Sequence, residues 1–216
     1  MSSLEEGLLY ILSTVGALLP IVNPLSTVGV VVTITQGLTE AERREQIRRA
    51  CIYMFWILTA FLVAGGVIMS FFGISIPGLR IAGGLIVSYI GFRMLFPEAS
   101  GISGQEQAEA AHKHDVSFTP LAMPMLSGPG SIGVVIGIAS TAQGGENVIL
   151  NHALVAIGIA VTAVISYVVL RAAMRLNGLL GATGMNAIAR LMGFLLVCIG
   201  VQFVINGIGE AVRNLS

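Results

Sequence analysis

Two short polar clusters interrupt otherwise apolar stretches of the chain, and both contain proline. The first runs from Asn23 to Thr27 and the second from Ser127 to Ser131. Their amide and hydroxyl groups can hydrogen-bond a small polar ligand, and glycine lets a ligand approach the backbone closely. The candidate substrate-binding residues are Asn23, Pro24, Ser26, Thr27, Ser127, Gly128, Pro129, Gly130 and Ser131.

The prolines predict that the helices carrying these clusters are broken. Asparagine is a strong N-cap, proline suits the first helical position, and the residue before a proline is pushed out of the α region. One helix should therefore end near Leu19–Val22 and another begin at Pro24. In the second cluster, which follows Pro120 and Pro124, a new half-helix should begin near Pro129.

Such breaks have two interpretations. Lipid cannot satisfy the backbone N–H groups that a break frees, and the partial positive charge of a half-helix N-terminus suits a carboxylate. Two such ends would make one central binding site. The alternative is a structural kink in which the hydroxyl groups bond back to their own helix.

The composition is that of a membrane protein. Of the 216 residues, 55% are hydrophobic and 10% are charged, and the mean hydropathy is +0.90. A soluble domain needs a larger charged share to cover its surface. A bilayer core of about 30 Å is crossed by about 20 apolar residues in a helix. Six stretches qualify: Gly7–Thr35, Cys51–Phe72, Pro77–Phe96, Phe118–Ala142, Val148–Leu170 and Met185–Ile208.

The positions of Lys and Arg predict the orientation. With six crossings, nine of the 11 basic residues fall on one side, around the loop at 36–49, the linker Pro97–Ser117 and the connection Arg171–Gly184. Only Arg80 and Arg213 fall on the other side. Basic loops stay in the cytoplasm, so both termini should be periplasmic. The sequence from Thr39 to Glu42 fits a capping box that starts the second helix before the membrane.

The charges also exclude several functions. With 11 acidic and 11 basic residues, the chain lacks the basic excess of a nucleic-acid-binding surface. A buried Asp pair, a Ser/His pair and an HExxH motif are all absent, so we do not expect an enzyme. No Asp, Glu, Lys or His falls in the middle of a predicted span. We expect no cofactor or metal, and a coupling Na⁺ or H⁺ would have to use carbonyl and hydroxyl groups, at a site the sequence does not identify.

Polar side chains near the span ends have simpler interpretations. Arg80, Arg93 and Arg190 are expected to extend to lipid headgroups. Gln202 and Asn206 are expected to form hydrogen bonds between helices. The glycines of the third span are expected to allow close helix contact.

The two halves of the chain resemble each other. Pro20 and Gly29 match Pro124 and Gly133 with the same spacing, and the segment from Arg80 to Gly91 matches that from Arg190 to Gly200. Each half would have three spans, an odd number, so the second half would insert upside down. The prediction is an all-α membrane protein of six transmembrane helices in two inverted three-helix repeats, residues 1–96 and 118–216, joined by a cytoplasmic linker, 97–117. The first and fourth helices would be broken near the midplane.

These residues also resemble a known family. Ser75-Ile-Pro77 through Gly84, Ile90-Gly-Phe-Arg through Pro97, and Arg190-Leu-Met-Gly through Cys198 are similar to the MarC family of bacterial inner-membrane proteins. So are Asn23-Pro24, Pro120 to Pro124, and Gln202 to Gly207. The resemblance covers nearly the whole chain. It implies a six-helix protein of the bacterial inner membrane related to LysE-type exporters and, more distantly, to a transporter of small neutral amino acids.

The pattern and the resemblance together predict a secondary transporter or exporter of small neutral amino acids or similar small zwitterions. It would work by alternating access, with the two half-helix N-termini holding the carboxylate. The partners expected are this substrate and the lipid bilayer, without nucleic acid. A homo-oligomer such as a dimer is compatible with this size. The alternative is a non-transporting membrane scaffold that binds a partner protein.

Overall fold

The computed structural model describes residues 3–35, 37–96, 115–142 and 147–214, so most of the predicted linker 97–117 lies outside the described residues. Within these ranges there is no β-strand. The helices are α1 (Ser3–Val22), α2 (Pro24–Ile34), α3 (Glu40–Phe71), α4 (Ile76–Leu95), η1 (Ser117–Leu126), α6 (Pro129–Ala142) and α7 (Val148–Arg213).

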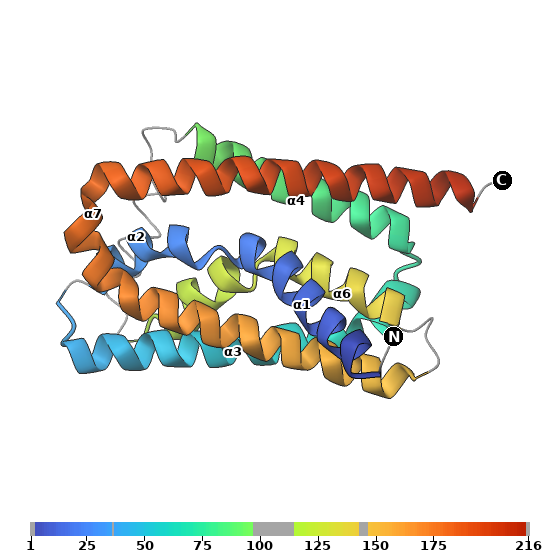
Figure 1. Ribbon diagram of the computed structural model, residues 1–216, viewed down its shortest axis with the longest axis horizontal. Helices are drawn as coiled ribbons and strands as arrows, with labels where there is room; N and C mark the ends of the chain where they lie inside the picture. Colours follow the sequence, from blue (N-terminus) through green and yellow to red (C-terminus); the bar gives the residue numbers. More distant parts are fainter. Residues whose placement is uncertain (1–2, 36, 97–114, 143–146, 215–216) are drawn as a thin grey trace.

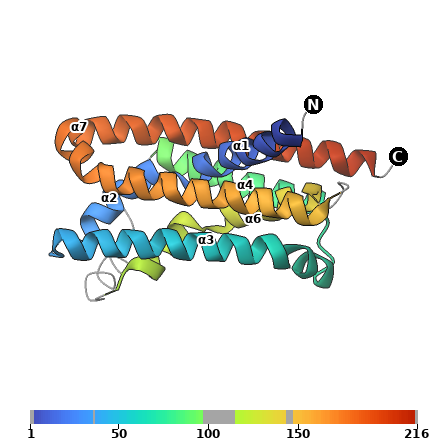
Figure 2. The ribbon, with the colours of Figure 1, turned by 60° about the horizontal axis from the view of Figure 1, so that its bottom comes forward.

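The helices form an elongated bundle (Figure 1). In this view α1, α2 and α6 run through the middle, with α3 along one side and α4 along the other. Helix α7 doubles back on itself, and its C-terminal arm lies along α4 (Figure 1). Figure 2 shows the N-terminal arm of α7 beside α3. The start of α1 and the end of α7 lie at the same end of the bundle (Figure 1).

The helix lengths agree with a protein that crosses a membrane several times. By length and composition, five helical segments of the described chain could span a bilayer, or six if η1 and α6, which meet at an angle of 59°, form one broken span. The two arms of α7 supply two of these segments, Val148–Ala172 and Arg190–Arg213. The all-helical membrane fold is confirmed, while the six-span inverted repeat remains a prediction.

Apolar residues lie on the outside of this bundle as well as in its core. Leu18, Leu58 and Leu121 are fully buried. In contrast, Phe71 is 82% exposed and Ile149 is 88% exposed. A soluble monomer rarely exposes large contiguous apolar patches, whereas a bilayer covers them with acyl chains.

Helix α3 holds both broken helices at one end of the bundle. Thr39 caps α3 through the predicted capping box with Glu42. The Arg43 side chain then donates to the hydroxyl and carbonyl oxygens of Thr35, at 2.8 and 3.0 Å, so a cation lies at the C-terminal end of α2. One turn further along, the Gln46 side chain accepts a hydrogen bond from the backbone N–H of Val116, where η1 begins.

The start of η1 is also fixed by Asp115. Its carboxylate accepts hydrogen bonds from the backbone N–H and the hydroxyl of Ser117 and lies 3.5 Å from Arg49. The bonds from Ser117, together with the charge of Arg49, hold the pKa of Asp115 below its ordinary value. The carboxylate is therefore charged at neutral pH and pins this end of the segment.

Glycines bring α4 into close contact with the C-terminal arm of α7, as the sequence predicted. A Cβ atom placed on Gly84 would lie 2.5 Å from the carbonyl oxygen of Gly200, and one on Gly91 would lie 2.6 Å from that of Gly193. A Cβ atom on Gly207 would lie 2.9 Å from the carbonyl oxygen of Pro77. The two backbones approach each other directly, as small residues allow in membrane proteins.

Candidate functional site

Both predicted breaks are present. Helix α1 ends at Val22 and α2 begins at Pro24, while α6 begins at Pro129. From the middle of the bundle α2 runs towards one end and α6 towards the other (Figure 1), so the two half-helix N-termini both lie centrally.

The breaks lie next to each other. A Cβ atom on Gly130, in the first turn of α6, would lie 3.2 Å from Cγ2 of Ile21, in the last turn of α1. It would also lie 3.0 Å from Cγ2 of Val87 on α4. Gly130 is buried between these helices, and a larger residue there would push them apart. The structure therefore brings the two predicted clusters together.

At the first break Asn23 has a positive φ of 42°. The Asn23-Pro24 pattern predicts an N-cap, which ordinarily has an extended backbone. A left-handed residue is instead the usual end of the preceding helix, and asparagine tolerates this conformation better than most residues do. Asn23 therefore ends α1 in addition to preceding α2. Its side chain is 5% exposed and donates to Sδ of Met94 at 3.4 Å.

The other residues of the first break are mostly engaged. Pro24 and Thr27 are buried, and the Thr27 hydroxyl donates to the carbonyl oxygen of Asn23 at 3.3 Å. This is the bond back to the helix that the structural-kink interpretation expects. The side chain of Ser26 lies outside the described residues.

At the second break the backbone is extended at two points. Thr119 has φ −122° and ψ 121°, and Met123 has φ −127° and ψ 123°, because each precedes a proline. The turns of η1 are consequently wide, and the N–H of Ser127 donates to the carbonyl oxygen of Ala122 at 2.8 Å. A Cβ atom on Gly128 would lie 2.6 Å from the carbonyl oxygen of Pro124, so this position requires glycine.

The Ser127 hydroxyl differs from those of the other candidates. It is fully buried, and among the described residues it has no hydrogen-bond partner. The hydroxyl of Ser131, also buried, donates to the carbonyl oxygen of Leu126 at 3.3 Å. An unsatisfied buried hydroxyl costs about 1–3 kcal/mol, so a polar ligand that pairs with it would recover this free energy.

The backbone around Ser127 offers further donors. The first turn of a helix leaves its N–H groups without partners inside the helix, and here Gly130 and Ser131 occupy that turn, while Pro129 has no N–H. The residues of both breaks are uncharged. Backbone dipoles and hydroxyl groups thus set the electrostatics of this site, and they favour a small anionic group such as a carboxylate.

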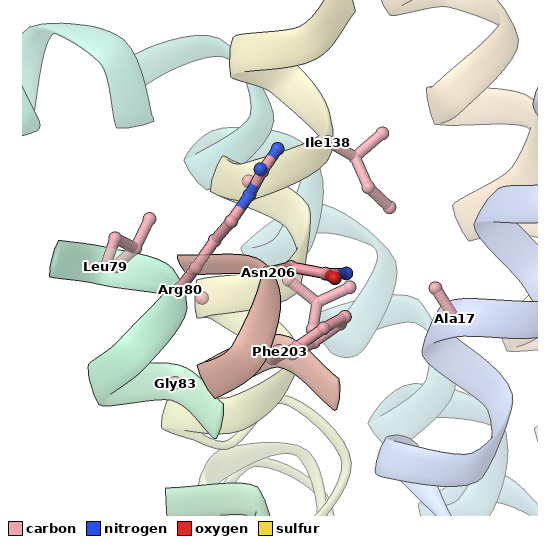
Figure 3. Close-up of a pocket in the computed structure, with 10 residues that line it drawn as sticks. Ala17, Leu79, Arg80, Gly83, Ile138, Phe203 and Asn206 are labelled. Carbon is pink, nitrogen blue, oxygen red and sulfur yellow. The ribbon is translucent and has the colours of Figure 1, made fainter. Parts of the chain in front are cut away.

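Sequence reasoning missed a cavity of about 230 Å³ beside the second break. Its lining residues come from four helices: Ala17, Leu79, Arg80, Gly83, Gly133, Val134, Gly137, Ile138, Phe203 and Asn206. Figure 3 shows the side chain of Arg80 extending from α4 towards α6, and the Asn206 amide from α7 within the same space.

Arg80 also forms an ion pair with Glu210 of α7. The expectation of a headgroup contact did not include this partner, and the headgroup contact itself stays a prediction. One signal in the sequence was available: Arg80 lies near the start of its helix, where the helix dipole does not favour a cation. The bond of Asn206 is likewise different from the expectation, because its Oδ1 accepts from Gln202 at 2.9 Å within the same helix.

Comparison with known proteins identifies relatives along nearly the whole chain. A family model described as "MarC family integral membrane protein" matches residues 8–212. Two similar proteins, from Escherichia coli strain K12 and from Shigella flexneri, are each named "UPF0056 inner membrane protein MarC". Each is 45% identical over 205 residues, which cover 91% of this chain and 93% of the relative. No solved structure matches the chain.

Proposed function

The chain belongs to the MarC family of integral membrane proteins, and from that premise we propose that it is a secondary transporter of small neutral amino acids or similar small zwitterions in the bacterial inner membrane. The relatives are named as inner membrane proteins, which supports the location. The apolar exterior and the five or six candidate spans support a protein surrounded by lipid. Neither name specifies a substrate, so the substrate class rests on the chemistry of the site.

The Ser127 hydroxyl is the observation that carries this proposal. It is buried without a partner among the described residues, at a break that lies against a second break. In the proposed complex the substrate carboxylate accepts hydrogen bonds from the Ser127 hydroxyl and from the free N–H groups at the starts of α2 and α6. Asn23, Ser26 and Ser131 hydrogen-bond the ammonium group or the remaining backbone polar atoms.

Alternating access requires two halves that can rock about this site. In the predicted repeat Gly84 matches Gly193 and Gly91 matches Gly200, because the two glycines of each half are seven residues apart. In the structure, however, Gly84 contacts Gly200 and Gly91 contacts Gly193. This exchange of partners is what a two-fold axis between α4 and the last arm of α7 produces. It supports an inverted pair comprising residues 1–96 and 118–216.

Transport can be tested with purified protein in liposomes. We expect uptake of glycine, alanine or serine driven by a Na⁺ or H⁺ gradient. If none of the three moves under any gradient, the transport proposal is wrong and a non-transporting scaffold becomes the better interpretation.

The role of Ser127 can be tested with a matched pair of variants. Ser127→Ala should raise the KM for uptake about tenfold, equivalent to one lost hydrogen bond to a charged group. Because the variant removes an unpaired buried hydroxyl, its thermal midpoint should stay equal or rise. Ser166 on α7 also has a buried hydroxyl without a partner among the described residues. Ser166→Ala should change the thermal midpoint in the same way as Ser127→Ala but leave the KM unchanged. An equal KM in both variants argues against a binding role for Ser127.

A further inference from the structure

The cavity lined by Arg80 is next to the central site but separate from its candidate residues. Gly133, in its lining, lies one helical turn after Gly130 on α6. A Cβ atom on Gly133 would lie 3.7 Å from Cα of Gly83, which lines the same cavity from α4. Glycine backbone from α4 and α6 therefore meets at the wall of the cavity, within one helical turn of the second break.

The size of the cavity suits a small solute. Its volume is about 230 Å³. Pockets for drug-sized ligands have volumes of about 300–1,000 Å³. Its polar side chains are Arg80 and Asn206, and the remaining lining residues are apolar or glycine.

Arg80 lines this cavity, whereas its ion-pair partner Glu210 is not one of the lining residues. Both side chains are about a quarter exposed, at 26% and 27%. Glu210 follows Asn206 by one turn on α7 and falls in the last turn of that helix, where the dipole disfavours an anion. Arg80 lies near the start of α4, where the dipole disfavours a cation. Each charge is thus placed against the field of its own helix.

A structural clamp is a weak explanation for this pair. The close contact of Gly207 with Pro77 already holds the same ends of α4 and α7 together. Partly exposed ion pairs contribute about 0–1 kcal/mol to stability. A cation and an anion that lie side by side are, however, complementary to a zwitterion, whose carboxylate pairs with the guanidinium and whose ammonium pairs with the carboxylate.

We propose that Arg80 and Glu210 form a second, peripheral binding site for the carboxylate and ammonium groups of a small zwitterion, in a vestibule that leads to the broken helices. The substrate enters between the two side chains. Its carboxylate then replaces Glu210 as the partner of Arg80, and its ammonium group replaces Arg80 as the partner of Glu210. Asn206 supplies an additional amide within reach of the same space. This inference rests on the proposed transport function.

The test compares Arg80→Gln and Glu210→Gln with wild type in liposomes, using Arg93→Gln, at the other end of α4, as the control. Each ion-pair variant should raise the KM for alanine uptake about tenfold, whereas Arg93→Gln should leave it unchanged. The distinguishing measurement is competition. Ethylamine has no carboxylate, so in Arg80→Gln the factor by which alanine competes better than ethylamine should fall about tenfold. Propionate has no ammonium group, so in Glu210→Gln the factor by which alanine competes better than propionate should fall similarly.

A pair that only clamps the helices predicts a different result. Both variants would then lower the thermal midpoint, keep the KM within twofold of wild type and leave both competition ratios unchanged, and the inference would be overturned. That outcome leaves the central site untouched, because Ser127→Ala reports on it separately. If wild-type protein moves no amino acid, the proposed function fails and this inference fails with it.

A cavity-filling variant tests the vestibule without altering a charge. A Cβ atom on Gly137, in the cavity lining, would have no atom within 4 Å, so Gly137→Leu can fill the space without displacing the backbone. We expect it to abolish uptake in a protein that still folds. Gly16 has similar room and lies on the exposed face of α1. Gly16→Leu should transport normally, and equal uptake in the two variants would contradict a vestibule.

Discussion

At the scale of single residues, Asn23 shows how one position combines a backbone and a side-chain role. Its positive φ of 42° ends α1 within the bundle, and its side chain is buried beside Met94. Glycine adopts positive φ freely, whereas a residue with a Cβ atom pays about 1–2 kcal/mol in this region. The two roles can therefore be separated by substitution.

Asn23→Ala and Asn23→Gly should differ in stability but agree in function. Both lose the amide, so both should raise the KM for uptake. Because the left-handed backbone strains alanine, the thermal midpoint of Asn23→Ala should be lower than that of Asn23→Gly by roughly 2–8 °C. This difference is expected for a strain of about 1–2 kcal/mol in a chain of this length. Differential scanning fluorimetry in detergent measures the difference. Equal midpoints would mean that the conformation of Asn23 does not limit stability, and a normal KM would remove its amide from the site.

The sequence predicted the residues around both breaks more completely than it predicted which of their polar groups are available to bind a ligand. The breaks follow from local rules, because Pro24, Pro120, Pro124 and Pro129 restrict their own backbone and that of the preceding residue. Whether a hydroxyl is engaged depends on atoms brought by tertiary packing. Composition and spacing therefore could not distinguish Ser127 from Ser131.

At the scale of helices, the glycine contacts fix the distance between α4 and the last arm of α7. The sequence indicated close packing through Gly84 and Gly91 but not the partner helix, since glycine carries no side chain whose pattern would reveal a neighbour. The same limit applies to Arg80: its position near the start of α4 was visible, but its partner Glu210 lies on a helix distant in sequence.

The neighbouring glycines Gly83 and Gly84 provide a matched test of this contact. A Cβ atom on Gly84 would lie 2.5 Å from the Gly200 carbonyl oxygen and 2.9 Å from Cγ2 of Val204, so Gly84→Ala must separate the helices. It should destabilise the protein by about 1–3 kcal/mol. A Cβ atom on Gly83 would have no atom within 4 Å, and Gly83→Ala should be neutral or stabilising by about 0.5–1 kcal/mol, because alanine favours the helix.

Thermal midpoints of both variants in detergent measure these effects. The prediction concerns their order, which does not depend on the detergent chosen. A Gly84→Ala protein as stable as Gly83→Ala would show that α4 and α7 can move apart without cost, and the glycine contacts would then not set the interhelical distance.

At the scale of the whole molecule, charge is distributed unequally between the two ends of the bundle. Arg43, Arg44, Arg48 and Arg49 lie at the start of α3, and the α7 arms meet at that same end (Figure 1). Arg80 and Arg213 belong to the other end, where α1 begins and α7 finishes. From the positive-inside rule we expect the first end to face the cytoplasm and the proposed vestibule of Arg80 to open to the periplasm.

This orientation predicts the behaviour of reporter fusions at the C-terminus. Alkaline phosphatase is active only after export, because its disulfides form in the oxidising periplasm, whereas green fluorescent protein exported in an unfolded state stays dark. A phosphatase fused after Ser216 should be active and a fluorescent protein at the same place dark. Fusions that end within the linker 97–117 should show the reverse pattern, since that linker is expected at the opposite end. Fluorescence from the C-terminal fusion would show the opposite orientation, in which the Arg80 vestibule faces the cytoplasm. The vestibule would then receive substrate for export rather than for uptake.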